Sequence, residues 1–252
     1  MRFVFLGTTG YHPNNRRHTA SIMFPEIGLV LDAGTGMFRA RDLLQTEELH
    51  IFLSHVHLDH CVGLSFLFDI GFQSGLKNSL VYGEAPKLEA IENKLLTELI
   101  FPAKLPMEYR PIAAEDVDGA VFELPGNTKL TTFPLKHPGG ALGFVIEQAD
   151  KRVAYVTDTT ASLSEPYLEY IQGVDVLIHE CYFPDGFEEQ AELTGHSCST
   201  PVAEVARQCN VGELLCVHVN PLDESDDPIG LETIRKIFAN ARIPNDLEEV
   251  IL

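Results

Sequence analysis

The sequence has little basic character and few marks of a secreted or membrane protein. Its 252 residues hold 18 lysines and arginines against 37 aspartates and glutamates, a formal net charge of −19, which opposes non-specific binding to polyanions. No apolar run approaches the roughly 18 residues of a membrane-spanning helix, and too few apolar residues precede Gly7 for a signal peptide. We therefore expect a cytoplasmic protein that does not associate with membranes.

Tryptophan is absent, and the five cysteines are irregularly spaced. An odd number of scattered cysteines does not resemble a disulfide framework, so we expect reduced thiols. The sequence also lacks internal repeats, low-complexity tracts and a convincing linker. Its hydrophobic fraction of 45% suits a chain that buries a substantial core, and we expect a single domain over residues 1–252.

Short apolar runs alternate with stretches of helical periodicity, which is typical of an α/β fold. The strand-like runs include RFVFL, GLVLDAG, HIFLSH, KLTTFPL, LGFVIE, VAYVTDT, VDVLIHE and ELLCVHVN. Apolar residues at helical spacing predict a helix from Lys87 to Leu99 and a last one over residues 230–239. Between them, Thr200 is expected as the cap of a further helix, with Pro201 at its first position.

Polar residues stand at or just past the ends of several strand-like runs: Asp32, His55, Asp158, His179 and His218. Ligands of layered α/β folds gather at the carboxyl ends of strands, so these residues are predicted to share one site. Each alone is also compatible with an ordinary polar residue at a strand end.

The segment from Ser54 to His60 reads Ser-His-Val-His-Leu-Asp-His. Residues at i and i+2 of an extended chain face the same side, so His55 and His57 are placed to chelate one ion. A turn after them would present Asp59 and His60 to a second ion. The alternative is a solvated polar turn, but apolar residues flank the motif on both sides.

His-x-His-x-Asp-His after an apolar strand resembles the metallo-β-lactamase superfamily, and the later residues resemble its phosphodiesterase branch, which includes tRNase Z. The matching later segments are LKHP, VAYVTDT, His-Glu after VDVLI, Gly-His-Ser and ELLCVHVNP. The resemblance covers nearly the whole chain and implies a four-layer αββα sandwich. It implies a first metal held by His55, His57 and His137, a second held by Asp59, His60 and His218, and Asp158 as the bridge.

Two divalent ions at these residues would leave a positive centre in an acidic protein, because two aspartates and one bridging hydroxide do not cancel their charge. That centre would bind a phosphate or carboxylate, and the hydroxide would be the nucleophile. Nitrogen and oxygen ligands favour zinc, with manganese and iron as alternatives.

The resemblance also implies roles for residues around the metals. The histidine that corresponds to His196 lies near the leaving group, with Glu180 beside it, so His196 would act as general acid and Asp59 would complete the catalytic set. His196 could instead buttress the helix near Thr200. His179 is expected to donate to Asp59 or Asp158, unless it is a packed core histidine, and Asp32 is expected to support the ligands.

The chain departs from tRNase Z in one respect. That enzyme carries a long arm that grips tRNA, inserted in the bacterial form between the third histidine and the bridging aspartate, whereas here His137 and Asp158 lie 21 positions apart. We therefore expect a phosphodiesterase for a small or cyclic phosphodiester or a short oligonucleotide, and not for tRNA. The alternatives are an ester or lactone hydrolase that uses the same hydroxide, and a metal-binding sensor without turnover.

Two further segments are candidates for contact with substrate. The loop over residues 7–19 carries Arg16, Arg17 and His18, which would meet phosphate if the loop lies beside the metals. Residues 100–118 are rich in proline and aromatic residues and are candidates for a pocket wall, a dimer surface or plain packing. Relatives with this fold are often dimers, so a homodimer is also expected.

Overall fold

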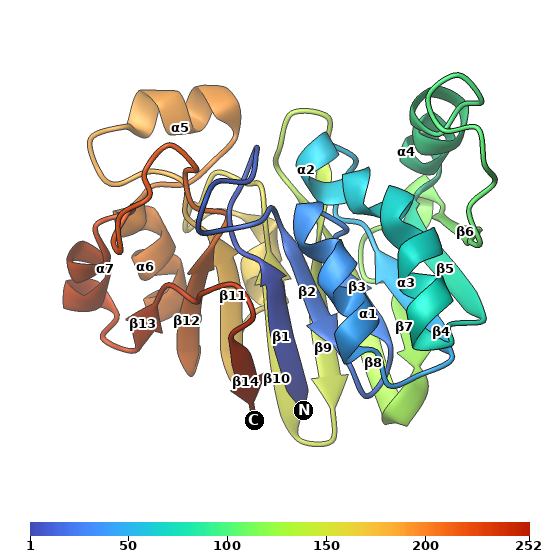
Figure 1. The fold of residues 1–252 in the computed structure, drawn as a ribbon. Helices are drawn as coiled ribbons and strands as arrows, with labels where there is room; N and C mark the ends of the chain where they lie inside the picture. The colour runs from blue at the N-terminus through green and yellow to red at the C-terminus, as the bar shows by residue number, and fades with distance from the viewer.

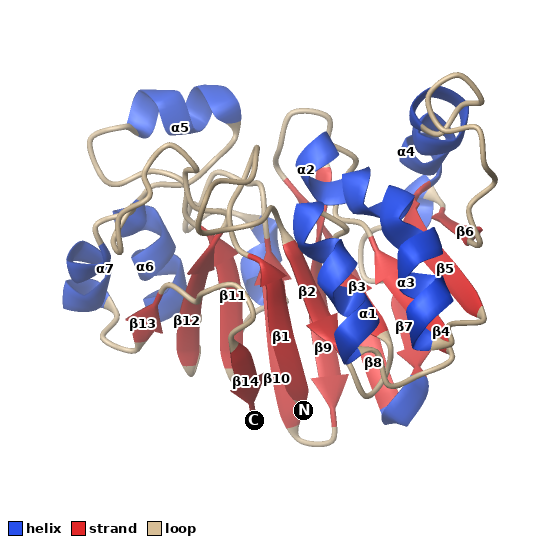
Figure 2. Cartoon of the chain, in the orientation of Figure 1, coloured by secondary structure: helices blue, strands red, loops and turns tan.

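The computed structural model describes the backbone of residues 1–252 and every side chain except that of Gln73. Two seven-stranded β-sheets pack face to face, and helices cover the outer face of each sheet (Figures 1 and 2). This arrangement confirms the predicted αββα sandwich. Among the described residues, no helix combines the length and apolar character that crossing a bilayer requires.

The first sheet is formed by the N-terminal half of the chain and its last strand. Its order is β14 (Glu249–Ile251), β1 (Arg2–Gly7), β2 (Ser21–Phe24), β3 (Leu29–Leu31), β4 (Glu48–Phe52), β5 (Asn78–Glu84) and β6 (Glu108–Ile112). The strands from β3 to β6 are parallel, so their carboxyl ends meet at one rim.

The second sheet is formed by the C-terminal half. Its order is β13 (Ala241–Arg242), β12 (Glu213–Val217), β11 (Val176–Glu180), β10 (Lys151–Val156), β9 (Ala141–Gln148), β8 (Thr128–Leu135) and β7 (Val121–Leu124). The strands from β10 to β13 are parallel to one another, and the strands from β7 to β10 form an antiparallel meander.

Successive side chains of a strand point to opposite faces of its sheet. The core therefore has one apolar layer between the two sheets and one between each sheet and its helices. Phe3 and Phe5 of β1 face the second sheet, whereas Val4 faces the helices that cover the first. In β11 the same alternation places Ile178 between the sheets and Leu177 against the outer helices. Three apolar layers result, and they hold both sheets and their helices in one domain.

Helices α1 (Ala40–Leu43), α3 (Leu67–Ser74) and α4 (Ala85–Ala90) lie on the side of the first sheet, and α2 (Leu58–Cys61) follows β4 at the rim. On the side of the second sheet, α6 (Ser199–Gln208) and α7 (Leu231–Ile237) pack against the strands, and α5 (Glu188–Thr194) lies above them. Helix α6 begins two residues earlier than the Thr200-Pro201 pair predicts.

The helix predicted from Lys87 to Leu99 is too long. Helix α4 passes into a π-helical turn over Ile91–Leu95, where the N–H of Leu96 donates to the carbonyl of Ile91. The chain then turns again at Thr97, so Leu99 leaves the apolar face and is 98% exposed. Leu88 and Ile91 are buried as predicted.

Candidate metal centre

Six strands deliver polar residues to one rim of the sandwich, the upper one in Figure 1. Asp32 follows β3, the His-x-His-x-Asp-His segment follows β4, and single residues follow at the ends of β8, β10, β11 and β12. Asp32, Asp158 and His218 have φ of 58°, 46° and 53°, in the left-handed region that non-glycine residues rarely adopt. Such strained residues cluster where a site demands a particular side-chain direction.

The first group of donors is His55, His57, His137 and Asp158, whose ligand atoms lie within 4.8 Å of one another. Oδ2 of Asp158 lies 3.4 Å from Nε2 of His55 and 3.6 Å from Nε2 of His137. Nδ1 of His57 lies 3.4 Å from the same nitrogen of His137. Three imidazoles and one carboxylate oxygen thus converge on a single point.

The second group is Asp59, His60 and His218. Oδ2 of Asp59 lies 3.3 Å from Nε2 of each histidine. The other oxygen of Asp158, Oδ1, lies 3.1 Å from Nε2 of His218 and 3.4 Å from Nε2 of His60. Asp158 therefore directs one oxygen to each group, which is the geometry of a bridging carboxylate.

The donor set fits a divalent cation in each group. Nε2 of His55 is buried without a hydrogen-bond partner among the described groups, and Nε2 of His60 faces Nε2 of His218 at 3.1 Å. Burial and the neighbouring His60 lower the pKa of His55 well below its usual range, which leaves the neutral imidazole that metals bind. Although burial opposes it, Asp158 and Asp59 raise the pKa of His60 well above its usual range, so the carboxylates here attract positive charge.

Buried groups behind the ligands fix their orientation. Asp32 is fully buried, and its Oδ2 accepts hydrogen bonds of 2.9 Å from Nδ1 of His60, from the Tyr155 hydroxyl and from the Ser54 hydroxyl. Nδ1 of His137 donates to the carbonyl of Gly195 at 3.0 Å. The contacts at Nδ1 of His60 and at Nδ1 of His137 leave Nε2 of each ring to face a cation.

His196 and Glu180 lie beside the two groups. Nδ1 of His196 lies 3.1 Å from Oε1 of Glu180, and His196 forms a further cluster with Asp158 and His218. Glu180 is fully buried and accepts hydrogen bonds from the backbone N–H groups of Thr159 and Ser197. Burial opposes protonation of His196, but the Glu180 carboxylate raises its pKa to about 9. His196 can therefore hold a proton at neutral pH.

Tyr182 also belongs to the site, although it lies outside the sequence motifs that predicted the other residues. Its ring stacks on His196 with centroids 4.7 Å apart and planes 15° apart, and lies 5.9 Å from the ring of His218. Its N–H donates to the carbonyl of Ser197, which ties the segment after β11 to the His196 loop. Its place two residues after Glu180 was the available signal.

His179 does not contact Asp59 or Asp158, so the predicted partners are wrong. Its Nε2 meets the hydroxyl of Tyr167 at 3.1 Å, and its Nδ1 donates to the carbonyl of Glu180. The reason is alternation along β11: His179 shares the helix-facing side with Leu177, whereas Glu180 points to the rim. The alternative interpretation, a packed core histidine, is the correct one.

The loop over residues 7–19 lies against the second group of donors, because the N–H of Tyr11 donates to Oδ2 of Asp59 at 2.7 Å. Arg17 is only 5% exposed and donates to Thr8 and to the carbonyl of Pro244, so the structure assigns it to loop packing and corrects the predicted substrate contact. Arg16 pairs with Asp226, and His18 meets the Thr35 hydroxyl. Substrate contacts by Arg16 and His18 remain predictions.

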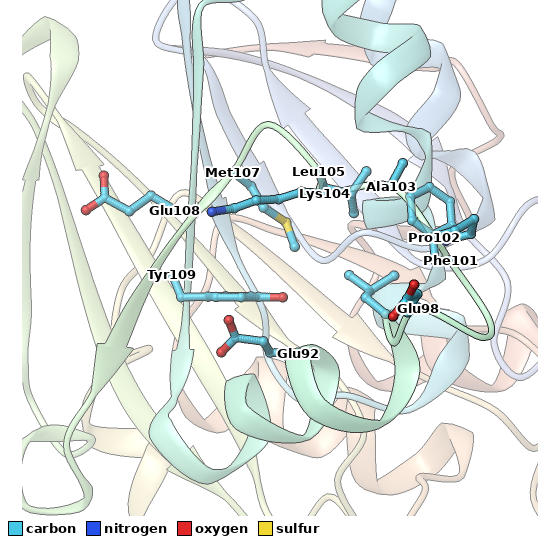
Figure 3. Close-up of a pocket in the computed structure, with 11 residues that line it drawn as sticks. Glu92, Glu98, Phe101, Pro102, Ala103, Lys104, Leu105, Met107, Glu108 and Tyr109 are labelled. Carbon is cyan, nitrogen blue, oxygen red and sulfur yellow. The ribbon is translucent and has the colours of Figure 1, made fainter.

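The segment over residues 100–118 lines a pocket of its own (Figure 3), with a volume of about 470 Å³. Phe101, Leu105, Met107 and Tyr109 form much of its wall, and Glu92 lies close to Tyr109 in the view. The lining residues include none of the seven metal-site donors. This pocket is separate from the rim site, so the geometry does not place the segment at the wall of the substrate site, and the dimer surface and plain packing stay predictions.

Substitutions at Gly10 and Gly71 test whether the loop over residues 7–19 packs closely on His218. A Cβ at Gly10 would overlap the imidazole of His218, whereas a Cβ at Gly71, within α3, meets nothing within 4 Å. We expect Gly10→Ala to displace His218 and to weaken metal binding roughly 10- to 100-fold, measured by chelator competition. Gly71→Ala should retain metal affinity and raise the melting temperature slightly, because alanine favours a helix. Equal metal affinity in the two variants would contradict the close packing of Gly10 on His218.

Comparison with known proteins agrees with this geometry. The sequence model of the family described as "Beta-lactamase superfamily domain" matches residues 28–219. Ribonuclease BN of Escherichia coli O6:K15:H31 is 26% identical to this chain, with 98% of each protein covered. That alignment spans 306 positions, more than the 252 residues of this chain, so the relative carries stretches that this chain lacks.

Two solved structures share the fold. The short form of human tRNase Z has a TM-score of 0.78 at 18% identity and covers 100% of this chain and 99% of its own. A diphosphatase from the PhnP family has a TM-score of 0.73 at 17% identity, with 99% and 97% covered. The chain therefore belongs to the metallo-β-lactamase superfamily, with its similarities in the tRNase Z-like branch, and is a metal-dependent hydrolase.

Proposed function

We propose that the protein is a phosphodiesterase that binds two divalent ions, with zinc as the preferred metal. It hydrolyses a small or cyclic phosphodiester or a short oligonucleotide. The observation that carries this proposal is the pair of His196 and Glu180 beside two groups of metal donors that share Asp158. Hydrolysis of a phosphodiester needs a centre that binds the anion and a proton for a basic leaving oxygen. The metal donors would provide the first, and His196 would provide the second.

Two divalent ions bound in such a site lower the pKa of water and neutralise charge on phosphate oxygens. The residues of the chain supply the rest. Glu180 holds Nδ1 of His196, so the proton available to a leaving group is the one on Nε2. Backbone donors from Thr159 and Ser197 keep Glu180 in place, and Tyr182 restrains the plane of the His196 ring.

Small substrates are supported over tRNA by what this chain lacks and by its charge. His137 and Asp158 lie 21 positions apart, and strands β9 and β10 with the tight turn between them fill most of the intervening chain, which leaves no room there for an arm. A net charge of −19 opposes a polyanion the size of tRNA. One relative is named a ribonuclease, which supports a phosphodiester, and one structural neighbour is named a diphosphatase, so both names concern hydrolysis at phosphorus.

The test is a substrate panel on metal-loaded protein: bis(p-nitrophenyl) phosphate, a 2′,3′-cyclic nucleotide, a dinucleotide, a lactone and a precursor tRNA. We expect kcat/KM for at least one small phosphodiester to exceed that for precursor tRNA and for the lactone by about 100-fold or more. Cleavage of precursor tRNA at a comparable rate would contradict the proposal. Hydrolysis of the lactone alone would identify an ester hydrolase, and metal binding without any turnover would indicate a sensor.

A further inference from the structure

Leu58 is an exposed apolar side chain in the middle of the metal-binding segment. It is the first residue of α2, between the donors His57 and Asp59, and is 61% exposed. One exposed leucine is ordinary on a protein surface. This leucine differs because other apolar side chains adjoin it and extend the apolar surface away from the metal donors.

Leu58 and Val56 form one wall of a groove with a volume of about 230 Å³. The end of α4 and the π-helical turn after it form the facing wall, with Ala90, Ile91, Lys94 and Leu95. One wall therefore comes from the segment that carries His55, His57, Asp59 and His60. Because Leu58 lies between the donors His57 and Asp59 in the chain, the groove lies beside the donor segment, although no donor lines it.

Helix α4 is tied to the second metal-binding loop as well. Nζ of Lys87 donates to the carbonyl of Gly140 at 2.6 Å, and Gly140 in turn donates to the carbonyl of His137. The turn over residues 91–95 has the i to i+5 hydrogen bond of a π-helix, a geometry that is frequent at functional sites. The groove is thus held in a set position relative to His57 and His137.

The charge of the groove suits a substrate with one anionic end. Lys94 is exposed and forms no ion pair with any described side chain, so its ammonium group is available in a chain of net charge −19. The remaining lining residues are apolar. The groove thus offers an apolar surface with one cation in its lining beside the metal donors.

We propose that this groove binds the apolar alkyl or aryl group that is esterified to the phosphate, and so sets the specificity of the site. The inference rests on the proposed function, since it places the phosphate at the metal donors. Leu58 is then a residue of the metal-binding segment that also affects substrate specificity, because its side chain forms part of the groove wall.

The experiment is a series of p-nitrophenyl alkyl phosphodiesters with methyl, propyl and hexyl groups, which share one leaving group. Burial of a methylene raises affinity at most about fourfold, so we expect kcat/KM to rise roughly twofold per carbon in an open groove. The rise should appear in KM, since the alkyl group does not react. Leu58→Ser should reduce the ratio of hexyl to methyl substrate from about 30-fold to below about 10-fold.

Ile251→Ser is the matched control, because Ile251 is 72% exposed on β14, at the end of the molecule away from the rim (Figure 1). It should leave the ratio of hexyl to methyl substrate unchanged. A flat wild-type series, or equal losses for all three substrates in Leu58→Ser, would overturn the inference while leaving the proposed function intact. A change of oligomeric state in Leu58→Ser, measured by sedimentation, with the chain-length ratio preserved, would show that a second copy covers the groove and would also overturn it. Failure to hydrolyse any phosphodiester would instead refute the proposed function and the inference with it.

Discussion

Asp158→Asn should remove metal from both groups of donors and reduce phosphodiester hydrolysis by more than about 100-fold. Oδ2 of Asp158 faces His55 and His137, and Oδ1 faces His60 and His218, so one carboxylate serves both groups. An amide keeps the shape but removes the negative charge and replaces one acceptor oxygen with an NH₂ group. Even the loss of a group that only supports a ligand costs 10- to 100-fold in affinity, so this change should cost more.

Elemental analysis of protein purified without chelator measures this result, with circular dichroism as the check on folding. Asp150→Asn, at the exposed turn between β9 and β10, is the matched control and should retain both ions. Loss of a single ion in Asp158→Asn would identify Asp158 as a ligand of one site and not as the bridge.

His196→Ala should produce a loss that depends on the leaving group. General acid catalysis contributes roughly 10²–10⁴ in rate, and the need for it grows with the basicity of the departing oxygen. Glu180 raises the pKa of His196 to about 9 against the opposing effect of burial, so the proton is present at neutral pH. We expect a large loss for nucleoside or alkoxide leaving groups and a small one for p-nitrophenolate, with both ions still bound.

Glu180→Gln should give a milder form of the same pattern, because a glutamine can still accept one hydrogen bond from Nδ1 but carries no charge. Metal content and melting temperature control for indirect damage, since Glu180 also binds the backbone of Thr159 and Ser197. An equal loss for p-nitrophenyl and alkyl leaving groups would assign His196 to phosphate binding or positioning, and the ester hydrolase interpretation would regain support.

The sequence predicted best the residues whose placement follows from local geometry. His55 and His57 are two positions apart in an extended segment, and Asp59 and His60 lie in the first turn after it. Asp32 follows the buried strand β3, and its carboxylate accepts hydrogen bonds from His60 and Tyr155. The αββα sandwich, which the family resemblance implied, is confirmed, whereas the strand-like runs by themselves predicted only an α/β fold.

Other expectations depended on information that single-strand patterns do not carry. His179 and Glu180 are adjacent, but only the packing of β11 between the outer helices and the first sheet decides which of the two side chains faces the helices. Arg17 looked available for phosphate until the fold brought Pro244, some 230 positions later, to its guanidinium group. The helix predicted to Leu99 ends early because a π-helical turn changes the phase of the apolar face at Leu96.

Metal titration of the chelator-treated protein tests whether two bound ions are needed for hydrolysis. Zinc is added in steps while hydrolysis of bis(p-nitrophenyl) phosphate and bound metal per chain are measured on the same samples. We expect activity to rise to a plateau at two ions per chain, because two groups of donors share Asp158. A plateau at one ion per chain, or full loading with two ions and no hydrolysis of any phosphodiester, would contradict it.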